Sequence, residues 1–436
     1  MTKEPRFYGW TLLVVMWLIV FANSFPYAGA SVSNVYMADE LHFNRSTLGL
    51  IFATFSWMSG MLGPVVAVCV DKRGVRFTLV LGSTIAALGA VLMATFVHTE
   101  VQAVAVFGVM MGLGFSVGGP LAAQAGIVRW FIKGKARAIS LLMTSSSIGG
   151  IVAPILLNRL SAGGHAGWRA GWWLVCGLSG CAALMTLFWV KERPSDLGQT
   201  PDGGLAGSES ISPGRQRKPQ VYKTREEWSY SEVLRSPTFW WLLIPGTGFS
   251  VTLPLLGAHE VAHLRDLGHS PAEAALSISI LSFAMLLGML GVAAFGDRIE
   301  PRWIWAASML VLSLGVLWAF KATGPVGPYR YAVVVGLGFG GAVPGGMTLM
   351  ANYYGNRPFA SIMGLLAVLA TTAGAIAAYG AGLVYDRFGS YAGAYYAVSL
   401  LCFAGFAALL LTRPPVRKAT PPLAIVDRDS HVHSYV

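Results

Sequence analysis

The chain has 436 residues, of which 55% are hydrophobic and 12% are charged, and its mean hydropathy is +0.59. Because an ordinary soluble domain carries about twice that share of charged residues, this composition excludes a chain whose main solvent is water. The formal charge of +11 would suit a polyanionic partner, so the positions of the basic residues must decide whether nucleic acid is that partner.

Twelve apolar stretches follow one another along the chain, and each has the length of roughly 20 residues that crosses a hydrocarbon core of about 30 Å as a helix. The first is too long and too apolar for a cleaved signal peptide, so we expect it to remain as a helix. We therefore predict an all-α membrane protein. The predicted spans are residues 9–34, 47–69, 77–97, 102–127, 138–160, 169–190, 238–262, 273–295, 303–320, 331–353, 359–382 and 392–412.

The basic residues are distributed unevenly between the two sides of these spans. If both termini face the cytoplasm, 24 of the 31 Lys and Arg residues lie on the cytoplasmic side and 7 lie outside. This asymmetry follows the positive-inside rule, so the membrane topology of the chain and attraction to anionic lipid headgroups explain its basic charge. We therefore predict a multi-pass protein of the cell membrane, with membrane lipid and no nucleic acid among its partners.

One long polar interval, rich in Gly, Ser, Pro and charge, separates six spans from six. It predicts four regions: an N-terminal six-helix bundle (1–190), a cytoplasmic linker (191–235), a C-terminal six-helix bundle (236–413) and a cytoplasmic tail (414–436). Fragments of the two halves also match. Pro26 in "FANSFPYAG" matches Pro254 in "GFSVTLPLLG", Asp71 in "VDKRGVR" matches Asp297 in "GDRIEPR", and "GLGFSVGG" at 112–119 matches "GLGFGG" at 336–341. The sequence therefore predicts two pseudo-symmetric bundles.

The "GLGFGG" stretch has the glycine spacing of a dinucleotide-binding turn. That motif has chemical meaning only between a strand and a helix, and here it falls within an apolar span. We interpret these glycines as small residues that let two helices approach closely. The four cysteines, Cys69, Cys176, Cys181 and Cys402, have no metal-ligand or disulfide spacing, and no hydrolase or nucleotide-loop motif occurs, so we expect no enzyme, no metal and no cofactor.

Several loops resemble a known family. The loop "DKRGVR" after the second span resembles the signature of the major facilitator superfamily, although Ala67 stands where that signature usually begins with Gly. The stretches "FYGW", "RWFIKGKARAIS", "GWRAGWW" and "YDRFGSY" are similar to bacterial members of the monocarboxylate transporter and oxalate/formate antiporter group. The resemblance implies two six-helix bundles that rock about a central cavity and open it to each side in turn.

The signature loop and its counterpart supply candidate gating residues. An acid at the end of a span can cap a helix N-terminus and pair with bases of the neighbouring bundle, which would hold one face closed. The alternative is that these are solvated cytoplasmic charges that only obey the positive-inside rule. The gating candidates are Asp71, Arg73, Arg76, Asp297 and Arg298.

The predicted membrane interior contains few ionisable residues. In the monocarboxylate transporters a lysine follows the Phe-Pro of the first helix, and here Tyr27 holds that position; their eighth helix carries an acid and an arginine, and "LSFAMLLGML" at 281–290 carries neither. His259, Glu260 and Arg159 remain as ionisable groups toward span ends. His259 could gain a proton and pair with a carboxylate, or it could be an interfacial histidine without a specific role.

Neutral polar side chains complete the candidate substrate site, although the alternative for each is packing or contact with the lipid interface. The candidates are Asn23, Tyr27, Gln124, His259, Asn352 and Tyr353. We predict a secondary transporter of a small organic anion, with a monocarboxylate as the favoured substrate, by proton symport or anion exchange. The alternatives are an exporter of apolar or cationic compounds and a non-transporting receptor on the same scaffold.

Overall fold

The computed structural model describes residues 7–131, 135–162, 167–201, 222–224, 228–295, 298–355 and 359–416. This part of the chain is helical and contains no β-strand, and eleven of its helical segments are long and apolar enough to cross a membrane, so the predicted all-α membrane fold is confirmed. The elements are α1 (Gly9–Leu41), α2 (Arg45–Met61), α3 (Gly63–Thr95), α4 (Glu100–Ala103), the π-helical η1 (Val104–Met111), α5 (Gly112–Gly118), α6 (Pro120–Trp130), α7 (Lys135–Ser161), α8 (Gly167–Trp189), the short 3-10 turn η2 (Pro194–Leu197), α9 (Tyr230–Arg235), α10 (Pro237–Asp266), α11 (Pro271–Phe295), α12 (Pro301–Phe320), α13 (Gly327–Tyr354), α14 (Phe359–Phe388) and α15 (Ala392–Leu411).

The second and third predicted spans are divided differently in the structure, because α3 contains a sharp break at Gly74. The backbone there has φ 89° and ψ 167°, a conformation that favours glycine. A Cβ at this position would also lie 2.5 Å from the Glu192 Oε1 atom. The span predicted at 47–69 thus consists of α2 and the part of α3 before Gly74, and the span predicted at 77–97 is the part after it. The second and third predicted passes thus correspond to the 17-residue α2 and to α3, and of these two helices only α3 is among the eleven segments long enough to cross a membrane. Twelve predicted passes and eleven such segments are therefore consistent.

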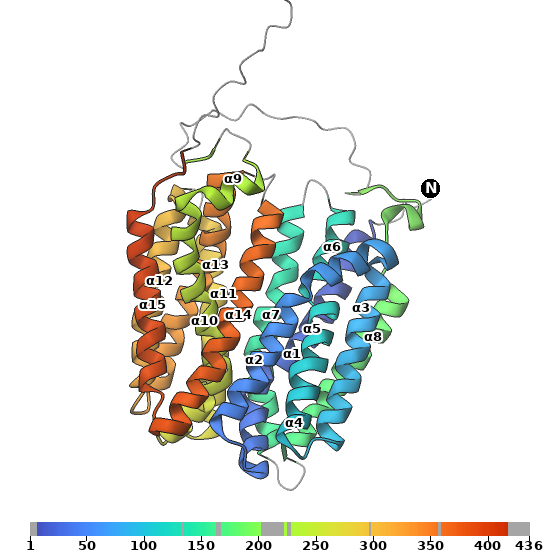
Figure 1. Cartoon of the computed structure of the whole chain (residues 1–436). Coiled ribbons are helices and arrows are strands. Elements are labelled where there is room, and N and C mark those ends of the chain that lie inside the picture. Colours follow the sequence, from blue (N-terminus) through green and yellow to red (C-terminus); the bar gives the residue numbers. More distant parts are fainter. Residues whose placement is uncertain are drawn as a thin grey trace, which may run out of the picture.

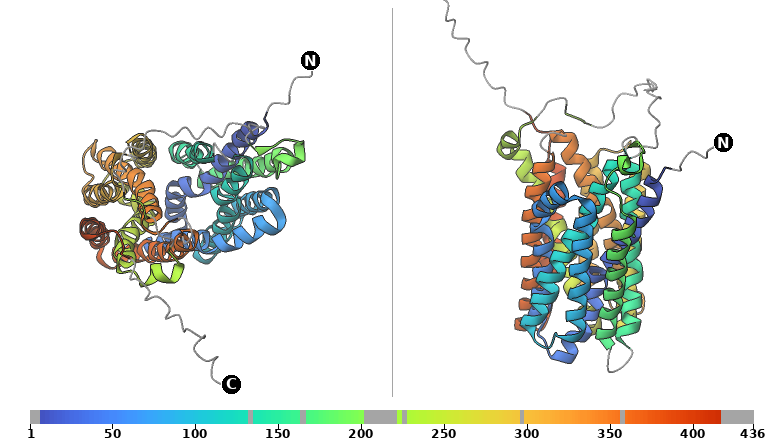
Figure 2. Two further views of the ribbon diagram at one scale, coloured as in Figure 1. Left: turned by 90° about the horizontal axis from the view of Figure 1, so that it is seen from above. Right: turned by 90° about the vertical axis from the view of Figure 1, so that its right-hand side faces the viewer.

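The helices form two groups that lie side by side (Figure 1). One half consists of α1 to α8 and the other of α9 to α15, and the view from above shows them as a blue-to-green and a yellow-to-red group (Figure 2). The halves meet where α2 packs against α14 and α7 packs against α11. We define the linker face by the starts of α1 and α10 and the ends of α8 and α15, and the distal face by the ends of α1 and α10 and the start of α2.

The predicted repeat appears in the contacts of its glycines. A Cβ at Gly112 would lie 3.1 Å from the Phe55 carbonyl oxygen, and a Cβ at Gly336 would lie 2.3 Å from the Leu281 carbonyl oxygen. Gly114 packs on Ala86 of α3, and Gly338 packs on Leu312 of α12. Phe55 and Leu281 are 226 residues apart, and so are Ala86 and Leu312. Equivalent helices therefore meet at equivalent glycines in both halves, which supports the interpretation of "GLGFGG" as a helix-packing motif.

Candidate substrate site between the two halves

Charged side chains join the two halves at the distal face. The Arg265 Nη1 atom on α10 lies 2.5 Å from the Asp39 Oδ2 atom on α1, and the Arg45 Nη2 atom at the start of α2 lies 2.9 Å from the Asp266 Oδ1 atom. These side chains are 21% to 49% exposed, so each pair contributes at most about 1 kcal/mol. Apolar packing continues the closure inward, since Val35 of α1 belongs to the same buried cluster as the apolar residues of α10.

The end of α14 adds a third contact to this closure. The two Asp386 carboxylate oxygens accept hydrogen bonds from the backbone amides of Arg45, at 3.1 Å, and Ser46, at 2.9 Å. A carboxylate of one half thereby binds the positive N-terminal end of a helix of the other half. Gly382 makes this approach possible, because a Cβ there would lie 2.5 Å from the Arg45 carbonyl oxygen. We name these groups the distal seal: Asp39, Arg45, Ser46, Arg265, Asp266, Gly382 and Asp386.

The linker face is organised differently. Glu192 accepts hydrogen bonds from the backbone amides of Val75, at 3.0 Å, and Arg76, at 2.7 Å, and forms an ion pair with Arg129 at 2.8 Å. All these groups belong to the N-terminal half. The helix-capping acid that we expected at Asp71 is therefore Glu192, which the sequence analysis had assigned to the linker.

The predicted gating residues do not bridge the halves. Asp71, Arg73, Arg76 and Arg298 are exposed. The Arg73 guanidinium lies over the Phe77 ring, 5.7 Å from its centre, and the Arg76 side chain donates to the Leu187 carbonyl oxygen. Asp297 lies outside the described residues. Across the described ranges, the hydrogen bonds and ion pairs that join helices of the two halves lie at the distal face.

A cavity of about 210 Å³ lies between the halves, on the linker side of the distal seal. Apolar side chains form most of its wall, and the polar groups are serine hydroxyls, one phenol and one carboxyl. This is the composition of a site for a small molecule: an apolar enclosure with a few placed polar groups. The lining residues are Val20, Ser24, Tyr27, Ala28 and Ser31 of α1, Phe115 of α5, Pro120 of α6, Ser146 and Gly150 of α7, Leu253, Leu256, Gly257 and Glu260 of α10, and Ile278, Leu281, Ser282 and Met285 of α11.

Tyr27 is the predicted substrate residue that the structure places in this cavity. Its ring packs against those of Phe52, Phe55 and Phe115, with centres 5.5 to 6.5 Å apart. These contacts fix the ring, and a Cβ on Gly257 of α10 would lie 3.5 Å from its hydroxyl oxygen. Within the described structure the hydroxyl has no hydrogen-bond partner, so it is available to a molecule in the cavity.

Two other candidates on the N-terminal half lie outside this cavity and have protein partners. The Asn23 side-chain amide donates to the Ser83 hydroxyl, at 3.0 Å, and to the Gly118 carbonyl oxygen, at 2.8 Å, so it fastens α1 to α3 and α5. The Gln124 amide donates to the Met143 sulfur at 3.0 Å. Their placement in this state favours the packing role that the sequence left open.

His259 is buried in the C-terminal half, away from the cavity lining. Its Nε2 atom lies 2.7 Å from the Ala378 carbonyl oxygen, and its Nδ1 atom lies 3.2 Å from the Tyr391 hydroxyl. A carbonyl oxygen only accepts, so Nε2 carries a hydrogen and donates it to Ala378. Both nitrogens therefore have protein partners, and this geometry does not support contact with an anion in this state.

Asn352 and Tyr353 lie at the linker face, near the end of α13. The Asn352 carbonyl oxygen accepts from the Thr224 amide at 2.8 Å, and the Tyr353 and Tyr222 rings meet edge to face with centres 5.6 Å apart. Both α13 side chains are buried. Asn352, through its backbone carbonyl, and Tyr353, through its ring, hold residues 222–224 against α13. Neither residue lines the central cavity.

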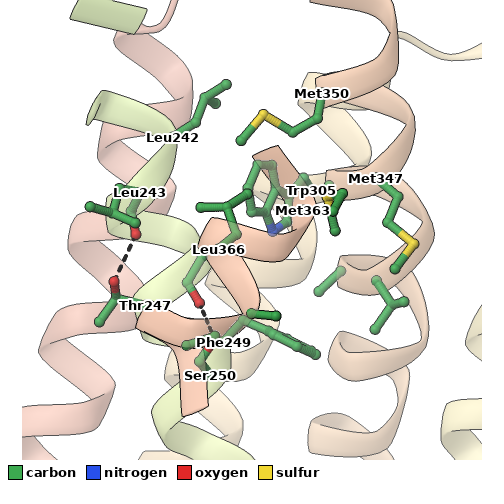
Figure 3. A pocket seen from close by; sticks show the side chains of 16 residues that line it. Leu242, Leu243, Thr247, Phe249, Ser250, Trp305, Met347, Met350, Met363 and Leu366 are labelled. Atoms are coloured by element: carbon green, nitrogen blue, oxygen red, sulfur yellow. Dashed lines mark hydrogen bonds between the residues drawn. The ribbon is translucent and has the colours of Figure 1, made fainter. Parts of the chain in front are cut away.

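A second cavity of about 180 Å³ lies within the C-terminal half, between α10, α12, α13 and α14 (Figure 3). Methionines, leucines and Trp305 surround it. Its two hydroxyls are turned to their own helix, since Thr247 donates to the Leu243 carbonyl oxygen at 2.8 Å and Ser250 donates to the Gly246 carbonyl oxygen at 2.7 Å. The cavity wall is therefore almost wholly apolar.

The sequence profile of the Major Facilitator Superfamily matches residues 16–265 and 246–427. The chain belongs to this superfamily. Monocarboxylate transporter 4 of Mus musculus is 25% identical over 402 residues, which cover 87% of this chain and 77% of that protein. The fujikurins efflux protein of Gibberella fujikuroi is 29% identical over 259 residues, or 58% of this chain and 48% of that protein. A solved structure of a mutant nucleoside transporter, NupG, has a TM-score of 0.73 at 14% identity and covers 92% of this chain and 99% of that one.

These findings confirm the predicted resemblance and identify a multi-pass membrane transporter of a small molecule, and not an enzyme. Sequence reasoning missed two features of the site. The distal seal joins residues near the ends of four helices that no local sequence pattern connects, and Glu260 was recognised as an ionisable residue in a span but left out of the candidate set. The run "HEVAHLRD" at 259–266 was the available signal, because it places five titratable or charged side chains within the last turns of a span.

Proposed function

We propose that the chain is a secondary active transporter that moves a small organic anion, with a monocarboxylate as the favoured substrate, across the cell membrane by alternating access, with proton symport or anion exchange. The observation that carries this proposal is the central cavity, which lies between two pseudo-symmetric halves and is closed on one side by the distal seal. The Tyr27, Ser146 and Ser282 hydroxyls are hydrogen-bond donors that suit carboxylate oxygens, and the surrounding wall suits a short carbon chain. Relatives named as monocarboxylate transporters support the same class.

The orientation belongs to the same proposal. The starts of α1 and α10 and the ends of α8 and α15 share the linker face, and the sequence gives 24 of the 31 basic residues to that side. The positive-inside rule therefore favours a cytoplasmic linker face with both termini inside. In that orientation the structure corresponds to a state closed to the outside.

Uptake into proteoliposomes tests the function. The purified chain should take up labelled lactate, pyruvate, formate or oxalate faster than protein-free vesicles, with and without a pH gradient. Tyr27→Phe should raise the KM for the transported acid about fivefold, because one neutral hydrogen bond contributes about 1 kcal/mol. Tyr379→Phe is the matched control, since that ring is 39% exposed on α14, and it should leave the KM unchanged. Absence of flux for all four acids would contradict the proposal.

A second candidate, export of an apolar or cationic compound, is favoured by a specific observation. The central cavity is lined by one carboxyl and by no Lys or Arg among the described residues, and the almost wholly apolar cavity of Figure 3 lies in the C-terminal half. Efflux of a lipophilic cation from preloaded vesicles, without uptake of any carboxylate, would support this function. Stabilisation of the protein by a carboxylate without flux would instead support a receptor.

A further inference from the structure

Glu260 is an acidic side chain inside a membrane-spanning helix, where ionisable groups are costly and by default mark a transport pathway. It lines the central cavity and is 3% exposed. It precedes the end of α10, at Asp266, by six residues, and the preceding residue, His259, packs against α14. Glu260 therefore lies where the cavity ends and the closed distal region begins.

The hydrogen bonds of Glu260 distinguish its two oxygens. The Tyr331 hydroxyl of α13 donates to Oε1, and the Ser277 hydroxyl of α11 lies 2.9 Å from the same oxygen. The Ser277 and Tyr331 oxygens are themselves 3.0 Å apart, so the three groups form a compact cluster. Because Oε1 is occupied by two hydroxyls, Oε2 is the oxygen that can take a proton and donate it in a hydrogen bond.

The surroundings of Glu260 provide no cation to pair with its negative form. Within the described ranges no Lys or Arg makes an ion pair with it, and Arg45, the basic residue of α2, is paired with Asp266. A buried carboxylate without a cation is strongly disfavoured relative to the neutral acid. The titratable and charged groups that face this region from the packed helices are Tyr27 (α1), Arg45 (α2), His259, His263 and Asp266 (α10), Tyr331 (α13), Tyr385 and Asp386 (α14), and Tyr391 and Tyr395 (α15). Two exposed basic residues, Lys321 and Arg330, line a neighbouring pocket with Tyr331 and make no ion pair with Glu260 in the described structure.

We propose that Glu260 carries the coupled proton of this transporter on its Oε2 atom, an inference that rests on the proposed monocarboxylate transport. With the distal side open, the Glu260 carboxylate takes up one proton, and the neutral acid donates a hydrogen bond to the carboxylate of the substrate in the cavity. When the linker side is open, the substrate leaves and Oε2 releases the proton to the same side. The carrier returns empty and deprotonated, and the hydrogen bonds from the Tyr331 and Ser277 hydroxyls to Oε1 stabilise the carboxylate during this step. One proton and one monovalent anion cross together, so no net charge moves.

Uptake and exchange in proteoliposomes test this assignment. An inward gradient of one pH unit should support about tenfold accumulation of the acid by the parent, as expected for one coupled proton. Glu260→Gln keeps an oxygen that accepts from Tyr331 and Ser277 but cannot change its charge. It should lose the accumulation and retain exchange of internal for external substrate. Glu100→Gln, a change at an exposed acid of α4, is the matched control and should behave as the parent. Accumulation by Glu260→Gln equal to that of the parent would overturn the inference and leave the proposed function standing.

Infrared spectroscopy gives a readout that does not depend on the substrate. The full-length parent should show the carbonyl absorption of a protonated carboxyl that disappears in Glu260→Gln and changes frequency in Tyr331→Phe. The band should decrease as the pH is raised. If the parent transports none of the acids tested, the proposed function fails, and this band still decides whether Glu260 holds a proton. Absence of a Glu260-dependent band throughout the pH titration would overturn the inference.

Discussion

The distal and linker faces of this transporter differ in which groups their charges bind. At the distal face, acids of one half bind bases or helix ends of the other: Asp39 binds Arg265, and Asp386 binds the start of α2. At the linker face, Glu192 binds α3 and Arg129 of its own half. The two faces thus use the same chemistry, a carboxylate at a helix N-terminus, for different purposes. The distal contact holds the halves together, and the linker contact holds one half in shape.

The distal face is closed by several weak contacts between the two halves. The distal contacts are individually weak, since their side chains are partly exposed, but they surround a close approach between α2 and α14. Weak contacts that can all separate together suit a face that must open in each transport cycle. Variants that act on the two faces separately should therefore have separable effects.

The largest effect is expected from Gly382→Leu on α14. The new side chain would meet the backbone of Arg45 and Ser46, where a Cβ alone lies 2.5 Å from both. Overpacking of this kind costs about 2 kcal/mol, so the closed distal state should lose population by roughly thirtyfold and transport should fall by a similar factor. The measurement is labelling of Ala28→Cys in the cavity wall by a membrane-impermeant thiol reagent from the distal side, in a chain whose four native cysteines are replaced.

The matched control for this variant lies two residues earlier in the same helix. A Cβ at Gly380 meets no atom within 4 Å, so Gly380→Leu should leave both labelling and transport close to those of the parent. Faster labelling in Gly382→Leu alone would support the distal seal. Equal labelling in both variants would show that the contact between α2 and α14 does not control access.

A smaller effect is expected from Asp386→Asn. The amide keeps one acceptor oxygen but loses the negative charge that binds the amides of Arg45 and Ser46. Loss of such a helix-capping group costs about 1 kcal/mol, which corresponds to about a fivefold shift away from the closed distal state. The same thiol-labelling assay measures it. Arg387→Gln changes an adjacent exposed charge and should have no effect, and an equal response of the two variants would contradict the role of Asp386.

Much of the fold could be predicted from the sequence, because apolar length and helical periodicity determine the membrane spans directly. The spans lie within the observed helices to within a few residues, apart from the break in α3, and the glycine repeat gives equivalent contacts in both halves. Helix ends were less predictable. The first span was expected to stop at residue 34 and α1 runs to Leu41, since charged Asp39 and Glu40 ended the apolar pattern but continue the helix. The division into four regions stays a prediction.

The site was less predictable, because it depends on which faces of distant helices meet. Tyr27 was placed in the substrate site by its position relative to a family motif, and it does line the cavity. Asn23 and His259 were chosen as polar side chains in apolar spans, and both have protein partners that only three-dimensional packing reveals. The contact of Arg45 with Asp386 joins residues 341 positions apart at the ends of two helices, and no local pattern links them.

The smallest effect on substrate binding is expected from Asp71→Asn at the linker face. Asp71 is exposed, and in this state the described structure gives it no contact with the C-terminal half, so affinity for substrate from the linker side should stay within about twofold of the parent. The sequence predicts that this acid pairs with bases of the other half when this face closes. An exposed charge contact formed only on closure contributes about 0.5 kcal/mol, so the maximal transport rate should fall about two- to threefold while the KM hardly changes.

Asp196→Asn is the matched control, because that carboxylate accepts from the Arg193 amide within its own turn. Initial rates of uptake over a range of substrate concentrations, with the two variants and the parent reconstituted in parallel, measure both quantities. A raised KM at an unchanged maximal rate in Asp71→Asn would mean that this acid acts on the bound substrate and not on closure of the linker face. The difference between the two faces could then not be explained by the role of their charges in closure.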